Sequence, residues 1–327
     1  MKTALIGAGV IGRVHAKILA SMGYEISAIC DTDTDKARYL ASEFCSNAKI
    51  YADYGELLNC ENVDVVHICT PHYLHKEQVI SALDKGINVL CEKPLCAHPD
   101  ELDAVLEAEK RSSAILGVSQ QNRYNEATRF ALDFMRDNKP VDAHGSVCWH
   151  RDEKYFRESP WRGKLYEAGG GSLINQALHT LDLAMLFCGM PSFVTAKIDT
   201  LIKREGVEVE DTVNAFFGGD AKFSFYSTNN CEKNYPAEVK LILEDGRELT
   251  VRQKSVLLDC EPIFTDESGS ASFGKSYYGN AHGALFAHFY DCIKTGCRFP
   301  IDGKEAAKVM KLIFAVYESN GQKTQIK

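Results

Sequence analysis

The 327-residue chain has no excess of positive charge and no long apolar run. It carries 37 Lys and Arg against 45 Asp and Glu, which gives a formal net charge of −8. Binding to nucleic-acid phosphates or an anionic membrane surface requires surplus Lys and Arg, so neither partner is expected. No apolar stretch approaches the roughly 20 residues of a membrane-spanning helix. The composition, 45% hydrophobic and 25% charged, is typical of a soluble globular protein.

The twelve cysteines include no C-x-x-C pair, the spacing typical of structural zinc sites and redox motifs. Cys30, Cys69 and Cys91 lie among Ile, Val and Leu in strand-like runs. We therefore expect reduced, buried thiols in a cytoplasmic protein rather than a disulfide framework. The His, Asp and Glu residues also lack metal-ligand spacing, so no metal site is predicted.

Residues 1–121 alternate short apolar runs with helical patterns. The apolar runs predict strands over residues 3–7, 25–30, 64–69, 87–91 and 114–118. The intervening patterns predict helices ending at residue 22 and over 34–44, 73–83 and 99–111. Strands that alternate with helices form βαβ units, and right-handed crossovers make the parallel sheet doubly wound.

Residues 122–327 follow a different pattern, so we predict a second domain there. Alternating segments with a period of two predict a largely antiparallel sheet. These segments span residues 193–201, 213–219, 221–228, 237–245 and 247–253, after a strand-like run at 143–151. Helices are expected over 126–137, from a glycine-rich start at 169–171, and over 282–294 and 304–320. The C-terminal helix can pack back on the first domain.

The segment GAGVIG, residues 7–12, fits the dinucleotide pattern G-x-G-x-x-G between a predicted strand and helix. Gly7 permits a tight turn, Gly9 lets the backbone approach a pyrophosphate, and Gly12 allows close packing. The helix N-terminus then offers N–H groups to the phosphates. Asp31, at the end of the second strand, would bind the adenosine ribose and repel a 2′-phosphate. No Arg follows it immediately in AICDTD, which favours NAD over NADP.

The run INVLCEKPL, residues 87–95, leads from a buried strand into Glu92, Lys93 and Pro94. Strands of an open parallel sheet end at the ligand crevice, so a cation there is a candidate for chemistry. The ordinary alternative is a solvated loop that follows a strand.

Taken together, GAGVIG, the E-K-P and GGGSLINQALHTLD (residues 169–182) resemble the glucose–fructose oxidoreductase/inositol dehydrogenase family, often written Gfo/Idh/MocA. TPHYLH (70–75), SPWRG (159–163) and YYGNAHG (277–283) are similar to it too, so the resemblance covers essentially the whole chain. It implies an N-terminal Rossmann domain and a C-terminal α/β domain with an open, mainly antiparallel sheet. The free face of that sheet would form a homodimer or homotetramer.

The activity implied by this resemblance is reversible, NAD-dependent oxidation of a secondary alcohol on a sugar, cyclitol or sugar derivative. Lys93 and His179 would meet around the reacting carbon in such a protein. His179 is the expected base, and Lys93 would stabilise the developing alkoxide. The predicted cofactor contacts are Gly7, Gly9, Val10, Ile11, Gly12, Asp31, Thr70, Pro71, His75, Glu92 and Lys93.

The substrate contacts are less defined by the motifs. Arg123, Tyr124, Arg151, Trp161, Arg162, Asn175 and His179 are the predicted substrate-binding residues, with Tyr278 and His282 as weaker candidates. Many family members carry Asp where this chain has Asn175, and we predict that this amide binds a substrate hydroxyl. Asp182, one turn beyond His179, is expected to be structural.

Two other functions fit the same motifs. A glycoside-cleaving enzyme could use bound NAD only transiently, oxidising the glycoside, allowing elimination and returning the hydride. A non-catalytic sensor would need only the dinucleotide pocket. The presence of both Lys93 and His179 disfavours the sensor, whereas Asn175 is compatible with it.

Overall fold

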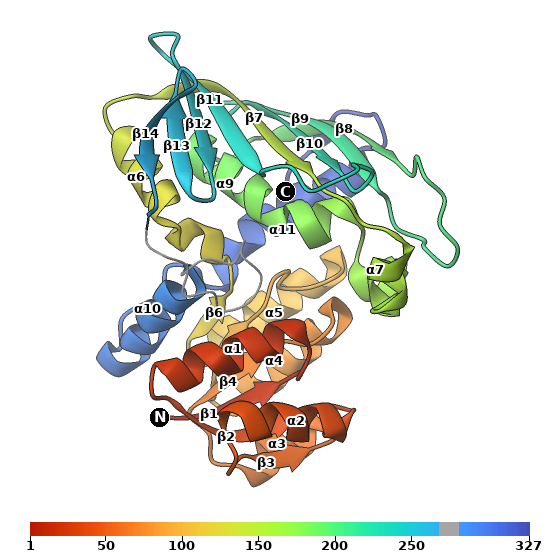
Figure 1. Ribbon diagram of the computed structural model, residues 1–327, viewed down its shortest axis with the longest axis vertical. Coiled ribbons are helices and arrows are strands. Elements are labelled where there is room, and N and C mark those ends of the chain that lie inside the picture. Colours follow the sequence, from red (N-terminus) through yellow and green to blue (C-terminus); the bar gives the residue numbers. More distant parts are fainter. Residues whose placement is uncertain (268–280) are drawn as a thin grey trace. The chain divides into compact units, whose positions relative to one another are not determined.

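The computed structural model describes residues 1–267 and 281–327. These residues form two compact units (Figure 1). The first contains residues 1–119 and 281–307, and the second contains residues 120–267 and 308–327.

The first unit contains a six-stranded sheet in which every pair of neighbouring strands is parallel. Its spatial order is β3 (Lys49–Tyr51), β2 (Glu25–Cys30), β1 (Lys2–Ile6), β4 (Val65–Ile68), β5 (Asn88–Cys91) and β6 (Leu116–Val118). The central strands are buried on both faces, and Leu5, Val66 and Val89 are completely inaccessible. The order reverses between β1 and β4, and ligands of open parallel sheets bind at this point.

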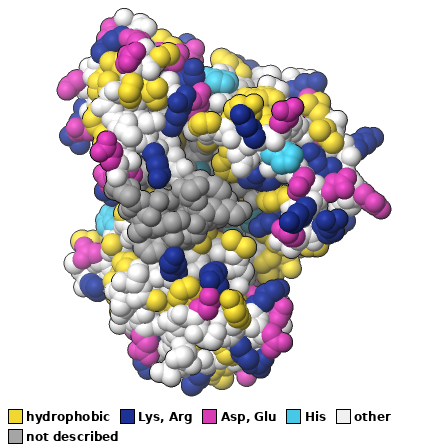
Figure 2. Space-filling model, viewed as in Figure 1, with side chains coloured by type: hydrophobic (Ala, Val, Ile, Leu, Met, Phe, Trp, Pro, Cys, Tyr) yellow, Lys and Arg dark blue, Asp and Glu magenta, His cyan; other side chains and the backbone are white. Residues whose placement is uncertain are grey.

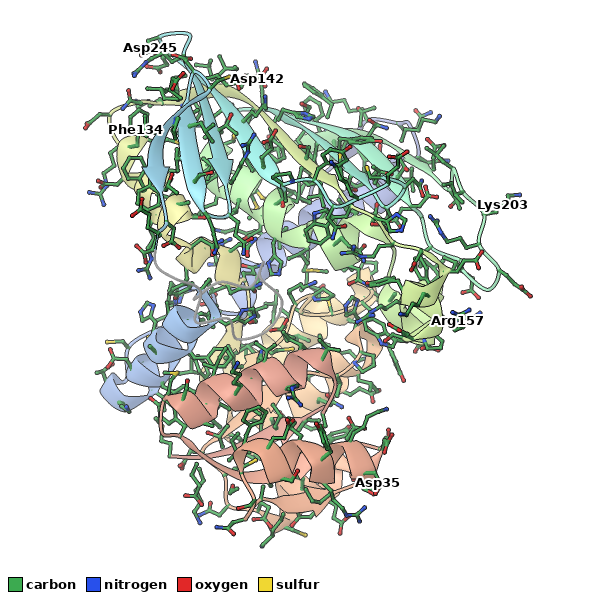
Figure 3. The ribbon with its side chains drawn as sticks, in the orientation of Figure 1. Asp35, Phe134, Asp142, Arg157, Lys203 and Asp245 are labelled. Carbon is green, nitrogen blue, oxygen red and sulfur yellow. The ribbon has the colours of Figure 1, made fainter. Side chains whose placement is uncertain are left out.

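Five helices follow strands of this sheet, namely α1 (Val10–Ser21), α2 (Thr34–Phe44), α3 (Tyr54–Cys60), α4 (His75–Leu83) and α5 (Pro99–Arg111). The first unit also contains α10 (Ala281–Thr295), from a later part of the chain. Local sequence explains where several of them begin. Asp33 accepts a hydrogen bond from the Lys36 N–H, and Asp53 does the same for Glu56. Asp35 adds a favourable negative charge to the first turn of α2 (Figure 3).

The second unit is built on a nine-stranded mixed sheet. Its order is β14 (Glu261–Thr265), β13 (Ser255–Leu258), β12 (Glu248–Arg252), β11 (Glu238–Leu243), β7 (Pro140–Cys148), β10 (Phe223–Thr228), β9 (Thr212–Gly218), β8 (Phe193–Asp199) and β15 (Thr324–Gln325). All neighbours are antiparallel except β7 and β10. Helix α9 (Leu178–Cys188) packs on β7 and β11, and α6 (Glu126–Phe134) packs on β12 and β13.

The face of this sheet away from α6 and α9 carries a row of polar and apolar side chains. Phe216, Ser224, His144 and Lys240 are consecutive cross-strand partners on β9, β10, β7 and β11. Phe216 is 50% exposed. The β11–β12 hairpin carries Asp245, which accepts a hydrogen bond from Arg247 (Figure 3). Figure 2 shows acidic and basic side chains interspersed on the displayed surface.

The parallel sheet and the mainly antiparallel sheet confirm the predicted fold class. Seven of the described α-helices and β-strands were not predicted, namely β3, α3, α7 (Glu153–Arg157), α8 (Leu165–Ala168), β13, β14 and β15. Each has seven residues or fewer, which is too short for a clear hydrophobic period to emerge. The glycine-rich helix start also differs from expectation, because residues 172–177 form a π-helical turn before α9. None of the described helices is long and apolar enough to cross a membrane.

Candidate active site

The glycine segment forms the loop between β1 and α1. Gly7 has a φ of +100°, and a Cβ at Gly12 would lie 2.0 Å from the Gly7 carbonyl oxygen. The turn and the helix therefore approach one another as closely as the motif requires. A Cβ at Gly9 would meet nothing within 4 Å. No side chain of the described residues caps the first turn of α1, and Val10 is 61% exposed.

Asp31 lies beside this loop at the end of β2. Its Oδ2 accepts a hydrogen bond from the Ala8 N–H at 2.8 Å, and its Oδ1 accepts one from Asp33 at 2.9 Å. The carboxylate is thus fixed at the carboxyl edge of the sheet, next to the glycine loop. This arrangement fits NAD, because the exposed helix N-terminus can receive a pyrophosphate and the acid can receive a ribose.

His75 connects the loops that follow β4 and β5. Its Nδ1 lies 2.6 Å from the Pro94 carbonyl oxygen, and its Nε2 lies 2.9 Å from the Thr70 carbonyl oxygen. The Thr70 hydroxyl donates to Gln78 Oε1 at 2.7 Å. Burial lowers the pKa of His75, and the two carbonyl contacts oppose that effect. These contacts make His75 a brace between two loops at the cofactor edge.

The E-K-P segment lies at the same edge. Glu92 and Pro94 are buried, Lys93 between them is half-buried, and the Lys93–Pro94 peptide bond is cis. Neighbouring parallel strands end at the same edge, so Lys93 after β5 and the glycine loop after β1 share the carboxyl edge of this sheet.

Glu92 faces two buried histidines. Sequence reasoning missed His15 and named His282 only as a weaker substrate candidate. Its Oε1 lies 3.0 Å from His15 Nε2 and 3.8 Å from His282 Nε2. Burial alone would raise the pKa of Glu92, but the hydrogen bond with His15 and the nearby His282 ring lower it well below its usual value. Burial lowers the pKa of His15. At neutral pH the group therefore contains an ionised carboxylate and a neutral His15 ring.

This histidine group continues into the core of the first unit. His15 Nδ1 lies 2.9 Å from His67 Nδ1, and His67 Nε2 lies 3.0 Å from the Tyr290 hydroxyl. The ligand atoms of His15, Glu92 and His282 also lie within 4.8 Å of one another, close enough to hold a metal ion. No such group was expected from the sequence. The detectable signal was a histidine inside the apolar run VVHI of β4.

His179 lies in the first turn of α9, after the π-helical turn that carries Asn175. Within residues 171–180 these two side chains alone are half-buried, and all the others are buried. They therefore share the accessible side of the helix. Gln121 Nε2 lies 3.2 Å from His179 Nε2. Because an amide N–H donates, this contact favours the neutral tautomer in which Nε2 carries no hydrogen.

Arg123 and Tyr124 have structural partners in the second unit. The guanidinium of Arg123 makes a two-pronged ion pair with Asp182, at 2.7 and 2.6 Å, and Asp182 is 1% exposed. This pair braces α9, as expected for Asp182. Tyr124 is 7% exposed, and Arg129 lies over its ring. Contacts of Arg123 and Tyr124 with a substrate remain predictions.

The remaining predicted substrate residues are linked by Tyr155. The guanidinium carbons of Arg151 and Arg162 lie 5.0 and 4.6 Å from the centre of the Tyr155 ring. Arg162 also lies over Trp161. The Tyr155 hydroxyl accepts a hydrogen bond from Gln176, the neighbour of Asn175, at 2.8 Å. Tyr155 and Gln176 therefore connect this cationic cluster to the His179 helix, and sequence reasoning missed both.

Two weaker substrate candidates remain, Tyr278 and His282. Tyr278 lies outside the described residues. His282 contacts Glu92 within the buried group of the first unit.

Comparison with known proteins identifies relatives along the whole chain. Residues 1–120 match the model described as "Oxidoreductase family, NAD-binding Rossmann fold". Residues 139–247 match the "GFO/IDH/MocA C-terminal domain" model.

Among curated proteins, D-glucoside 3-dehydrogenase of Escherichia coli K12 is 30% identical over 200 residues. This alignment covers 59% of the present chain and 55% of the relative, so the chain spans about half of that protein's length. Myo-inositol 2-dehydrogenase of Thermotoga maritima is 24% identical, with 100% of this chain and 98% of the relative covered.

Among solved structures, the WlbA dehydrogenase from Bordetella pertussis in complex with NADH and UDP-GlcNAcA is 25% identical. It superposes with a TM-score of 0.85 over 100% of this chain and 98% of that one. The two domain models and these full-length matches agree with the glycine loop, the E-K-P and the glycine-rich helix start. The chain therefore belongs to the Gfo/Idh/MocA family of NAD-binding oxidoreductases.

Proposed function

We propose that the protein is an NAD-dependent dehydrogenase that oxidises a secondary hydroxyl of a sugar, cyclitol or sugar derivative. The observation that carries this proposal is the shared carboxyl edge of the first unit. The glycine loop, Asp31 and the half-buried Lys93 all lie at that edge. A dinucleotide bound there would have a cationic side chain at the same edge. The glucoside and inositol dehydrogenases among the relatives indicate the class of substrate.

Oxidation of an alcohol removes a hydride from carbon and a proton from oxygen. NAD, when bound, supplies the hydride acceptor. Lys93 would hydrogen-bond the substrate oxygen as negative charge develops on it. His179 would take the proton, and such positioned bases contribute roughly 10²–10⁴-fold to a rate. The contact with Gln121 supports this role, because it keeps Nε2 in the form that can accept a proton.

The proposed substrate-binding residues belong to the second unit. Asn175, half-buried on the same side of the helix as His179, would bind a neighbouring hydroxyl. Trp161 would offer an aromatic face to the C–H groups of a sugar ring. Arg151 and Arg162 would bind hydroxyl or carboxylate oxygens.

The direct test is NADH absorbance with purified protein, NAD and a panel of inositols, aldoses, glycosides and nucleotide sugars. We expect NADH to accumulate with one substrate class and Lys93→Ala to lose that activity. Lys85→Ala is the matched control, because Lys85 is an exposed lysine before β5, at the opposite end of the same strand. It should retain the wild-type rate.

Other outcomes point to other functions. Cleavage of a glycosidic bond without net NADH would assign the transient-oxidation mechanism instead. NAD binding without any turnover across the panel would favour the sensor. Equal losses in the Lys93 and Lys85 variants would contradict the role of Lys93.

Two further properties belong to this proposal. We infer a homodimer or homotetramer formed through the open face of the second sheet, supported by the exposed Phe216 and Ile242. Light scattering should give a multiple of the 36.3 kDa chain, and Phe216→Asp should reduce it. A monomeric wild type would contradict this.

A reducing, cytoplasmic location is supported by the twelve cysteines, none of which forms a disulfide in the structure.

A further inference from the structure

The glycine turn Gly169–Gly171 is held by a carboxylate that comes from a distant part of the chain. Glu210 lies in the segment between β8 and β9. Its Oε2 accepts a hydrogen bond from the Gly171 N–H at 2.6 Å, and its Oε1 accepts one from Leu173 at 3.0 Å. The Ser172 N–H donates to the backbone oxygen of Glu210 at 3.1 Å. One residue therefore accepts three consecutive N–H groups of the turn.

Tyr317 of α11 (Gly303–Ser319) completes this arrangement. Its hydroxyl donates to Glu210 Oε1 at 3.1 Å. A Cβ at Gly170 would lie 2.1 Å from the Tyr317 hydroxyl, and one at Gly171 would lie 1.9 Å from the Glu210 backbone oxygen. The second and third glycines of the motif therefore make room for Tyr317 and Glu210.

The three N–H groups belong to the start of the helix that carries the proposed base. The first N–H groups of a helix have no partner within it and need one from outside. No side chain within residues 172–177 caps this turn, and Glu210 supplies the acceptors. Asn175 lies within the turn and His179 follows it directly. The position of Glu210 thus sets the direction in which this helix leaves the turn.

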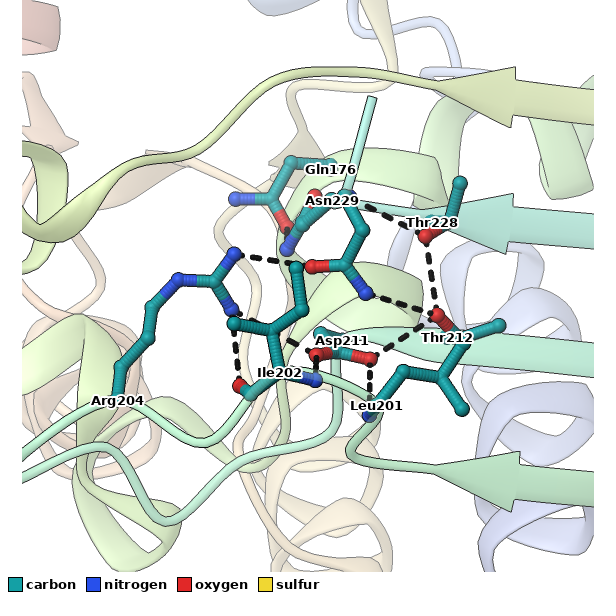
Figure 4. A network of polar contacts seen from close by, with 9 residues as sticks. Gln176, Leu201, Ile202, Arg204, Asp211, Thr212, Thr228 and Asn229 are labelled. Atoms are coloured by element: carbon teal, nitrogen blue, oxygen red, sulfur yellow. Dashed lines mark hydrogen bonds and ion pairs between the residues drawn. The ribbon is translucent and has the colours of Figure 1, made fainter. Parts of the chain in front are cut away.

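The charges around Glu210 are few. Among the described residues its carboxylate contacts N–H and O–H donors and makes no ion pair with Lys or Arg. Asp211, the next residue, turns its carboxylate towards the Leu201 and Ile202 N–H groups and Arg204 (Figure 4). Among residues 1–267 and 281–327, Tyr317 is the titratable group that faces Glu210. Burial, followed by the nearby Glu210 charge, raises the pKa of Tyr317 well above its ordinary value.

We propose that Glu210 is a positioning residue for His179, acting through the glycine turn. Its carboxylate holds the turn and the first helical N–H groups, so that the imidazole and Asn175 keep the alignment that proton removal requires. The proposal rests on the proposed dehydrogenase function.

Burial raises the pKa of Glu210 to about 7 against the opposing effect of its hydrogen bonds. Ionised Glu210 accepts stronger hydrogen bonds than the protonated acid, so turnover should rise as pH increases through this region.

The test compares Glu210→Gln with Glu208→Gln. The glutamine at 210 keeps the shape of the side chain but replaces one acceptor oxygen by a donor. Glu208 is the matched control, because it also accepts a backbone N–H, that of Leu165 at 3.0 Å, but at the start of α8 (Leu165–Ala168). Steady-state kcat and KM would be measured with the preferred polyol at several pH values around neutrality, together with NAD affinity.

We expect Glu210→Gln to lower kcat on the order of 10- to 100-fold, as small misalignments do. Its NAD affinity should be unchanged, and its kcat should lose the wild-type rise near neutral pH. Tyr317→Phe, which removes one donor, should act in the same direction with a smaller effect, and it serves as the second variant should Glu210→Gln fail to fold. Glu208→Gln should behave like wild type.

A wild-type kcat and pH profile in Glu210→Gln, or an equal loss in Glu208→Gln, would overturn the positioning role. If the wild type oxidises no substrate in the panel, the proposed function fails separately. Amide hydrogen exchange at Gly171 and Leu173 then tests whether Glu210 protects these two N–H groups. Faster exchange in Glu210→Gln than in Glu208→Gln would show that the Glu210 carboxylate holds the turn, and equal exchange would refute this.

Discussion

Glycine serves opposite purposes in the two glycine turns of this protein. Within the described part of the chain, the loop at residues 7–12 leaves the start of α1 open, since a Cβ at Gly9 meets nothing within 4 Å and no side chain caps the helix. The turn at Gly169–Gly171 is already occupied by Glu210 and Tyr317. Both turns present helical N–H groups to an anion. In the first the anion would be the cofactor's pyrophosphate, whereas in the second it is the protein's own carboxylate.

The difference between an occupied and an open turn is tested most strongly at Gly171. Gly171→Ala places a Cβ 1.9 Å from the Glu210 backbone oxygen. Either the glycine turn or the segment that carries Glu210, just before β9, must therefore move. We expect the free energy of unfolding of the second unit to fall by about 4 kcal/mol or more. Both tryptophans, Trp149 and Trp161, lie in this unit, so their fluorescence during urea unfolding reports it.

Gly163→Ala is the control for this prediction, because its Cβ would meet Val207 at an ordinary 3.4 Å. It should leave the same unfolding transition nearly unchanged. A similar loss in both variants would mean that the occupied turn is not special.

The charge within the occupied turn predicts a dependence of stability on pH. The pKa of Glu210 is raised in the folded state from 4.5 to about 7, so folding favours the protonated acid. Its stabilising contribution is complete below pH 4.5 and is lost as pH rises through about 7. Wild type should therefore lose about 3 kcal/mol relative to Glu210→Gln over this interval, measured by urea unfolding at each pH. A constant difference between the two proteins would contradict the raised pKa.

The open turn predicts a smaller effect that concerns ligand binding alone. Gly9→Ala should fold normally, since no atom of the described residues lies within 4 Å of the new Cβ. Its methyl group would nevertheless occupy the space where a pyrophosphate approaches the backbone. We expect NAD to bind about tenfold more weakly, a difference of ~1.4 kcal/mol, as measured by calorimetry. Unchanged affinity would show that the cofactor does not approach Gly9.

Much of the first unit could be predicted because its signals are local. The pattern G-x-G-x-x-G, the acid at the end of β2 and the alternation of apolar runs with helices each lie within a few tens of residues. They follow from φ freedom, helix periodicity and strand burial, which depend on neighbours in the chain. The shortest elements, β3 and β14 among them, escaped prediction because three to five residues are held mainly by their pairing partners.

The sequence alone determined the fold class and the dinucleotide loop, because each depends on short patterns with their own geometry. Lys93 and His179 became candidates for a catalytic pair through the family resemblance of the motifs that carry them. Only the tertiary structure decided which charges meet. Glu210 reaches Gly171 across 39 positions, His15 reaches Glu92 across 77, and Arg123 reaches Asp182 across 59. A buried charge or N–H group must find a partner wherever the folded chain offers one. That choice depends on which surfaces pack together, and no local pattern in the sequence records it.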